Sequence, residues 1–232
     1  KLSKCFDHLS KLSDDTYCNY DHPFINIDNY KITSDKIISL FDFENIDNFY
    51  KLNDQNKILE IGAGSGRLSE CLLSINQNFN YTICDIPPSI YIAYQRLKLR
   101  FPKKKIKLLI NIDDAKQLIN EINKNDISFI FPHQVKIIKE FYFDLTIAVD
   151  CLHEMDKDTL NYYFNSLNHS TKNFYFSIWK KTKNWGSGNF FKKTENLDFD
   201  NGDYNIPNNW EKKFQENLKF PSNQIGLGFK IK

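Results

Sequence analysis

The sequence predicts an α/β fold, a mostly parallel sheet with helices on both faces, and two observations lead to this. From residue 57 onward, short apolar runs with strand character alternate with longer segments whose apolar residues recur at helical spacing. A glycine-rich turn joins the first of these strands to the first of these helices. Because parallel strands need crossover connections that usually contain a helix, this alternation is typical of Rossmann-like sheets.

The first 50 residues differ from the rest in being polar and aromatic without regular alternation. Helical patterns are found at residues 2–12 and 34–43, and an irregular stretch around Asp21-His22-Pro23 separates them. We interpret residues 1–50 as a small N-terminal helical cap and residues 51–232 as the Rossmann-like domain.

The predicted elements of the main domain follow one another in the order that a parallel sheet requires. Short apolar runs predict strands at residues 57–61, 81–84, 127–131, 144–149 and 173–179. Helical spacing predicts helices at residues 67–75, 89–101, 113–122 and 158–167. Residues 105–110 are also apolar, and their pairing stays open. Runs at residues 210–220 and 225–231 predict a C-terminal antiparallel hairpin that closes the sheet.

Composition narrows the class of protein. The 31 basic and 29 acidic side chains give a net charge of +2, which argues against a nucleic-acid-binding protein with a concentrated basic face. No run of eighteen apolar residues predicts a membrane span, and no signal peptide is visible. The five cysteines are odd in number, widely spaced and free of CxxC, which favours a reducing, cytoplasmic location over a disulfide framework or a structural zinc site.

The strongest motif is the glycine loop Gly62-Ala63-Gly64-Ser65-Gly66, which lies between a predicted strand and a predicted helix. Glycines allow a sharp turn and a close approach to a ligand, and the following helix start offers free N–H groups. A dinucleotide fingerprint would place its third glycine at position 67, where this chain has Arg67. Glu60, before the loop, would repel a pyrophosphate and suit the ammonium of a methionine moiety. The pattern therefore favours S-adenosylmethionine as the cofactor.

Asp85 ends the second predicted strand, beside the glycine loop in a parallel sheet. A carboxylate at this place accepts hydrogen bonds from ribose hydroxyls in related nucleotide-binding folds. A capping role for Asp85 at the start of the next helix is the alternative. The upstream glycine loop favours the ribose-binding interpretation.

Several segments resemble a known family. Residues 59–67 (LEIGAGSGR) resemble the first motif of class I methyltransferases. Residues 85–88 (DIPP) with the following Tyr91-Ile92-Ala93 resemble a stretch of the bacterial sugar O-methyltransferase family, and the segments FIFPHQ, FDL and LHEM are similar to later motifs of that family. The matches extend from residue 58 to residue 155, which is the cofactor-binding half.

The resemblance implies a role for each matched position. The loop residues would cradle the methionine part of S-adenosylmethionine, and these are Glu60, Gly62, Ala63, Gly64 and Gly66. Asp85 would hold the ribose and Ile86 would pack on the adenine. Pro132, His133 and Gln134 would lie near the adenine edge. Cys151 and the residues up to Glu154 would lie beside the transferred methyl group.

Transfer to a hydroxyl requires a base that takes the proton of the acceptor. His153 is the first candidate because imidazole titrates near neutral pH. Glu154 and Asp150 are alternatives, either as the base or as the group that orients His153, and His133 is the second histidine candidate for the base. Asp150, His153 and Glu154 could also suit a divalent metal, but their spacing is generic and we expect no metal site.

The acceptor is less defined by the sequence than the cofactor. The resemblance implies a sugar hydroxyl, in a glycan or a nucleotide sugar. A phenol, an amine or another small molecule is the alternative. Aromatic residues after residue 179 could stack on a sugar face or pack in a hairpin or dimer interface, and these are Trp185, Phe190, Phe191, Tyr204 and Trp210. A homodimer is possible on this basis. A nucleic-acid methyltransferase, a non-catalytic cofactor-binding module and an NAD-dependent oxidoreductase are disfavoured.

Overall fold

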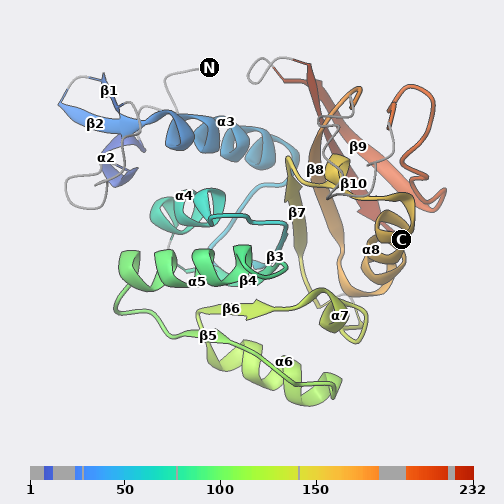
Figure 1. The fold of residues 1–232 in the computed structure, drawn as a ribbon, viewed down its shortest axis with the longest axis horizontal. Coiled ribbons are helices and arrows are strands. Elements are labelled where there is room, and N and C mark those ends of the chain that lie inside the picture. Colours follow the sequence, from blue (N-terminus) through green and yellow to red (C-terminus); the bar gives the residue numbers. More distant parts are fainter. Residues whose placement is uncertain are drawn as a thin grey trace, which may run out of the picture.

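The computed structural model describes residues 8–12, 24–27, 29–76, 78–140, 142–182, 197–218 and 223–232. A large sheet runs through the molecule (Figure 1). Its order is β5 (Ile106–Leu108), β6 (Ile127–Ile130), β4 (Asn80–Cys84), β3 (Lys57–Ile61), β7 (Leu145–Val149), β8 (Asn173–Trp179), β10 (Gln224–Ile231) and β9 (Trp210–Asn217). The strands from β5 to β8 pair in parallel, and β10 pairs antiparallel with both of its neighbours. The predicted fold class is confirmed.

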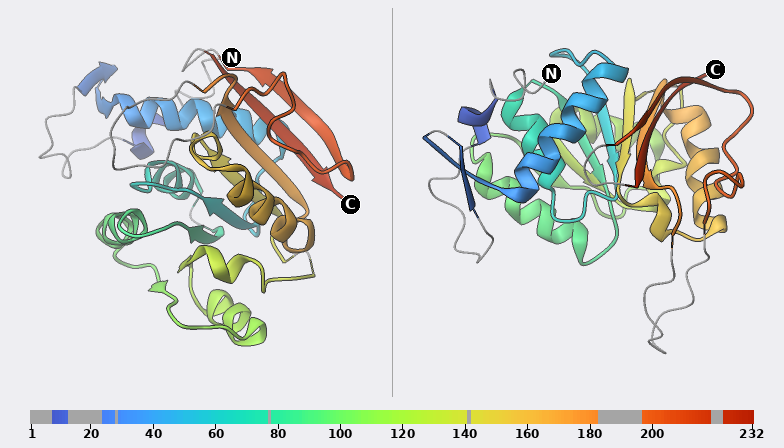
Figure 2. Two further views of the ribbon diagram at one scale, coloured as in Figure 1. Left: turned by 45° about the vertical axis from the view of Figure 1, so that its right-hand side comes forward. Right: turned by 90° about the horizontal axis from the view of Figure 1, so that it is seen from above.

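Helices cover both faces of the sheet (Figure 2). One face packs against α3 (Ser34–Phe49), α4 (Arg67–Ile75) and α5 (Ser89–Arg100), and the other packs against α6 (Ala115–Lys124), α7 (Pro132–Val135) and α8 (Lys157–Ser170). Successive strand residues point to opposite faces. Ile58 accordingly packs in the α4–α5 layer, whereas Leu59 packs in the α6–α8 layer. Because both faces are covered, the central strands are mostly apolar, as the sequence indicated.

Several boundaries differ from the predictions. β5 pairs with β6, which answers the open question about residues 105–110. Residues 24–33, predicted to be irregular, contain a hairpin of β1 (Phe24–Ile27) and β2 (Tyr30–Thr33), because four-residue strands give too few alternations to detect. α3 extends beyond residue 43 because the buried Ile46 continues its apolar face among polar neighbours. In the C-terminal hairpin, β10 inserts between β8 and β9.

The N-terminal helices are fixed to the main domain by charged side chains. Lys36 of α3 and two arginines of α5 surround Glu70 of α4, with Lys36 Nζ 3.1 Å and Arg96 Nε 2.6 Å from its carboxylate. Although burial raises the pKa of Glu70, the charges of Arg96 and Lys36 bring it below its ordinary value. Glu70 therefore stays ionised. The proposed division of the chain at residue 50 stays a prediction, and Ile46 packs in the same apolar cluster as α4 and α5.

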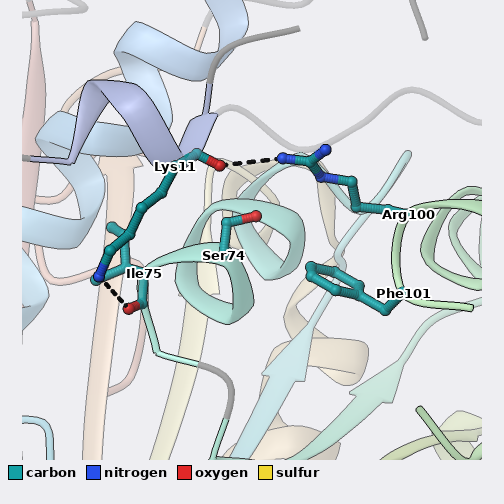
Figure 3. Close-up of a pocket in the computed structure, with 5 residues that line it drawn as sticks. All are labelled: Lys11, Ser74, Ile75, Arg100 and Phe101. Atoms are coloured by element: carbon teal, nitrogen blue, oxygen red, sulfur yellow. Dashed lines mark hydrogen bonds between the residues drawn. The ribbon is translucent and has the colours of Figure 1, made fainter. Parts of the chain in front are cut away.

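The short helix α2 (Leu9–Leu12) is held at the end of α4 (Figure 3). Lys11 Nζ donates to the carbonyl of Ile75 at 3.0 Å, and Arg100 donates to the carbonyl of Lys11 at 3.0 Å. Ser74 and Phe101 complete the lining of a small open pocket between these side chains. The observed α2 is the last turn of the helix predicted over residues 2–12, whose first part lies outside the described residues.

The order of the strands fixes where a ligand can bind. From β3 the chain proceeds to β4 on one side and later returns to β7 on the other side. In open α/β sheets, ligands bind outside the carboxyl ends of the strands at such a switch point. The glycine loop follows β3 at this point. Within the described part of the chain, no helix is long and apolar enough to span a bilayer.

Candidate active site

A cavity of about 730 Å³ opens at this switch point, and we call it the glycine-loop cavity. Its lining comes from the glycine loop, the residues after β4 and β7, the 3₁₀ turn η1 (Leu152–Glu154) and the first turns of α8. The volume lies within the range of small-molecule and cofactor sites, roughly 300–1,000 Å³. The cavity therefore has the position and the size of a ligand site.

The glycine loop requires glycine because its backbone has positive φ values and because Cys151 approaches Gly62 too closely for a side chain. Gly62, Gly64 and Gly66 have φ values of +69°, +57° and +79°, a region that other residues rarely adopt. A Cβ on Gly62 would lie 2.6 Å from the Cβ of Cys151, so the loop and the residues after β7 touch there. A Cβ on Gly64 would meet nothing within 4 Å. Gly62 and Gly64 both line the cavity.

Asp85, predicted to hold a ribose, lies on the cavity wall directly after β4. One carboxylate oxygen accepts the N–H of Gly64 at 2.7 Å, and the other accepts the N–H of Ile86 at 2.7 Å. Burial raises the pKa of Asp85, although these two backbone donors oppose the shift. Each oxygen can still accept a second hydrogen bond. Asp85 thus fixes the loop and keeps acceptor capacity for a ligand.

Glu60, predicted to face the methionine moiety, does not line the cavity. The alternation of β3 turns it toward the α4–α5 layer, where it is 3% exposed and accepts a hydrogen bond from the Tyr81 hydroxyl at 2.9 Å. Burial raises the pKa of Glu60 to about 7. Ala63 is likewise buried in this layer. Glu60 therefore lies behind the loop, and the Ala63 side chain, within the loop, packs in this layer and does not line the cavity.

Of the residues predicted to lie on or near the adenine, some line the cavity and others do not. Ile86 lines the cavity and is 60% exposed, so its apolar surface is free for a planar ligand. Gln134 is fully buried in α7, where its amide accepts from the N–H of Phe131 and donates to the carbonyl of Ile112. His133 is exposed and stacks on Phe131, whereas Pro132 lines the cavity.

Asp150 and Cys151, directly after β7, both line the cavity. The Cys151 thiol donates to the carbonyl of Ile61 at 3.2 Å, and burial raises its pKa well above the ordinary value, so it is a wall residue and not a nucleophile. Asp150 has a φ of +58°, and its Oδ1 accepts from Trp179 at 3.0 Å and from Gln224 at 2.6 Å. These donors fix the Asp150 carboxylate in one orientation.

His153 and Glu154 differ in their access to the cavity. Glu154 lines it, whereas His153 stands beside Asp150, with His153 Nε2 3.7 Å from Asp150 Oδ1. The His153 side chain is 12% exposed, and its Nδ1 has no partner among the described atoms. Burial lowers the pKa of His153, although the Asp150 charge opposes the shift. Burial and the Asp150 charge both raise the pKa of Glu154.

One wall of the cavity, formed by α8 and by Met155 shortly before it, was not predicted from the sequence. This wall contains Met155, Asp158, Thr159, Tyr162 and Tyr163. Positions 158 and 162 are one turn apart on a helix that follows the LHEM segment. This spacing predicts that the two side chains share one face of the helix. The apolar residues of α8 indicated only the face that packs in the core.

The aromatic residues considered for sugar stacking lie elsewhere where they are described. Trp210 is 6% exposed and packs edge-on against Phe164 and Phe174, and its indole donates to Asn168. Tyr204 is 1% exposed. Both side chains are therefore core residues of the C-terminal part, and the sugar-stacking alternative is wrong for them. Trp185, Phe190 and Phe191 lie outside the described residues.

Asp150, His153 and Glu154 do not form a recognisable metal site. Across the described residues, no group of three or more His, Cys, Asp or Glu side chains is arranged to hold an ion. Cys71, Cys84 and Cys151 are free thiols.

Comparison with solved structures shows which proteins share this fold. The PH0226 protein from Pyrococcus horikoshii OT3 is similar over 82% of this chain and 90% of its own, with a TM-score of 0.56 and 15% identity. A SAM-dependent methyltransferase from Aquifex aeolicus is similar over 84% of this chain and 92% of its own, with a TM-score of 0.52 and 14% identity. The pyocyanin biosynthetic protein PhzM matches 84% of this chain and 55% of its own, with a TM-score of 0.51 and 10% identity.

Neither the family models nor the curated proteins contain a match to this sequence. At these identities, the structural likeness shows the fold alone. The chain has the Rossmann-like α/β fold that is also found in SAM-dependent methyltransferases.

Proposed function

We propose that this chain is an S-adenosylmethionine-dependent methyltransferase that binds its cofactor in the glycine-loop cavity. The observation that carries the proposal is the contact between Asp85 and the N–H of Gly64, because it joins the two cofactor motifs of the sequence at the switch point of the sheet. The fold of the similar structures supports the same function.

The residues of the cavity fit this cofactor. The open space beside Gly64 leaves room for a ligand against the loop backbone, and the adjacent Asp85 retains lone pairs for ribose hydroxyls. Ile86 offers an exposed apolar surface for the adenine. Glu60, behind the loop, would act through the loop conformation. When bound, S-adenosylmethionine would supply an electrophilic methyl group.

The acceptor must lose a proton, and Asp150, His153 and Glu154 are the groups near the cavity that can take it. We propose His153 as the base, with Asp150 orienting its imidazole across the 3.7 Å between them. Its lowered pKa keeps the imidazole unprotonated at neutral pH, as a base requires. Glu154 is the second candidate because its carboxylate lies on the cavity wall.

The acceptor is proposed to be a hydroxyl of a sugar, which rests on the resemblance of the DIPP and LHEM segments to sugar O-methyltransferases. A phenol or an amine is the alternative acceptor. The test is transfer of a radiolabelled methyl group from S-adenosylmethionine to a panel of sugars, nucleotide sugars, phenols and amines. Labelled product from a sugar supports the proposal, and product from phenols or amines alone would replace the acceptor class.

Variants separate the candidate bases. His153→Ala should reduce kcat by about 10²–10⁴-fold and leave cofactor affinity unchanged, while Glu154→Gln has a smaller effect. His169→Ala, at an exposed site in the last turn of α8, is the matched control. An unchanged kcat in His153→Ala with a large loss in Glu154→Gln would assign the base to Glu154.

A further inference from the structure

The wall of the glycine-loop cavity is acidic. Its lining contains four carboxylates, those of Asp85, Asp150, Glu154 and Asp158, and within the described lining there is no lysine, arginine or histidine. The cavity itself is identified by the glycine loop and the strand order, independently of these carboxylates. The charge of the wall therefore bears on what the site binds, not on whether it is a site.

Two of the carboxylates have structural partners and two do not. Asp85 accepts backbone N–H groups, and Asp150 accepts the side chains of Trp179 and Gln224. The side-chain carboxylates of Glu154 and Asp158 form no hydrogen bond or ion pair with another described residue. Asp158 lies in the first turn of α8, where the helix dipole stabilises its negative charge. The Asp158 side chain is exposed, and its carboxylate keeps its hydrogen-bonding capacity free.

Aromatic rings accompany the free carboxylates. Tyr162 lies one helical turn after Asp158, and Tyr163, which is largely buried in the core, contributes its remaining surface to the cavity wall. The Tyr162 hydroxyl donates to the carbonyl of Pro132 at 2.8 Å, which fixes the ring. Carboxylates next to aromatic faces recognise ammonium groups, because the charge and the ring both attract a cation. A phosphate in the same place would meet only repulsion.

We infer that the acceptor carries an ammonium group that binds at Asp158 and the neighbouring tyrosine rings, which makes an amino sugar the substrate class. This inference rests on the proposed function. The cofactor brings an ammonium, a sulfonium and a carboxylate, so its single net positive charge offsets one of the four wall carboxylates. The remaining negative charge selects against nucleotide sugars and sugar phosphates. Asp158 is then a specificity-determining residue, separate from the proposed bases.

The experiment compares acceptors that share a hexose ring and differ in the charge of their substituents. Glucosamine, galactosamine and mannosamine are each paired with their N-acetyl and 6-phosphate forms, and kcat/KM for methyl transfer is measured at fixed, saturating S-adenosylmethionine. Asp158→Asn removes the charge and keeps the shape. Asp200→Asn, at an exposed position outside the cavity lining, is the matched control. Titration of each variant with S-adenosylmethionine tests the proposed function separately.

For at least one hexosamine, we expect kcat/KM to exceed that of the N-acetyl form by about tenfold or more, mainly because KM is lower. The difference from the phosphate form should be larger still. Asp158→Asn should remove most of that preference and leave cofactor affinity unchanged, and Asp200→Asn should change neither. Equal or better use of the N-acetyl or phosphate forms, no transfer to any hexosamine, or an unchanged preference in Asp158→Asn would overturn the inference. Loss of S-adenosylmethionine binding in the unmodified protein would instead contradict the proposed function.

Discussion

Alanine substitutions at Gly62 and Gly64 provide a matched test of how the glycine loop is built. Both residues have positive φ, so a Cβ at either position incurs the strain of the left-handed region, about 1–2 kcal/mol. The lower flexibility that alanine gives the unfolded chain affects both variants alike. The two variants therefore differ in what surrounds the new methyl group.

The surroundings predict a clear difference in stability. At Gly62 the added Cβ would lie 2.6 Å from the Cβ and 2.7 Å from the Sγ of Cys151, whereas at Gly64 it would meet nothing within 4 Å. Overpacking of this kind costs about 1–3 kcal/mol. We expect Gly62→Ala to lower the free energy of unfolding by about 2–5 kcal/mol, and Gly64→Ala to lower it by about 1–2 kcal/mol.

Urea unfolding followed by circular dichroism measures both values. The double variant Gly62→Ala, Cys151→Gly removes the obstructing atoms, so its destabilisation should be smaller than the sum of the two single changes by about 1–3 kcal/mol. Equal destabilisation by Gly62→Ala and Gly64→Ala, together with additivity in the double variant, would refute the contact between the loop and Cys151. Gly64→Ala should in addition weaken S-adenosylmethionine binding at least tenfold, because Gly64 lines the proposed cofactor site.

Three further predictions concern groups around the site. The Glu60 pKa of about 7 exceeds its unfolded value of 4.5, so the free energy of unfolding should fall by about 3 kcal/mol as pH rises from 4.5 to 7. Glu60→Gln should abolish this fall in urea unfolding measured across that pH range, and identical pH profiles for the two proteins would contradict the burial effect. Arg67 pairs with the buried Asp42 at 3.1 Å, so Arg67→Met should leave a buried carboxylate unpaired and lower the free energy of unfolding by about 3–5 kcal/mol. The double variant Arg67→Met, Asp42→Leu should recover most of this loss, and additive losses would refute the pairing. Trp210→Phe should lower stability by about 1–2 kcal/mol without changing KM for the acceptor, whereas a raised KM at unchanged stability would show that Trp210 contacts the substrate.

The sequence predicted the elements with strong periodicity and missed those that depend on tertiary contacts. β3, α4 and β8 were predicted with their observed boundaries, because apolar runs and glycine punctuation define them locally. The hairpin of β1 and β2 consists of strands too short for a pattern. The insertion of β10 between β8 and β9 depends on long-range pairing that no local signal encodes.

The candidate site was predicted only in part, because local motifs indicate some of its residues and tertiary packing determines the others. Gly62, Gly64 and Asp85 come together because a parallel sheet brings the carboxyl ends of neighbouring strands to one edge. Glu60 is adjacent in sequence to these residues, yet the strand pleat turns it to the other face. Gln134 is polar and near the site, but its amide satisfies backbone groups around α7. Which polar side chains face a cavity thus depends on packing that the sequence does not display.

The central claim is that the glycine-loop cavity holds S-adenosylmethionine through Asp85, and calorimetric titration tests it most directly. Protein first shown to be free of carried-over cofactor is titrated with S-adenosylmethionine and separately with NADH, alongside Asp85→Ala and the control Asp200→Asn. We expect micromolar binding of S-adenosylmethionine by the unmodified protein and the control, at least a hundredfold weaker binding by a folded Asp85→Ala, and no binding of NADH. Absence of S-adenosylmethionine binding by the folded unmodified protein, or unchanged affinity in Asp85→Ala, would contradict the account.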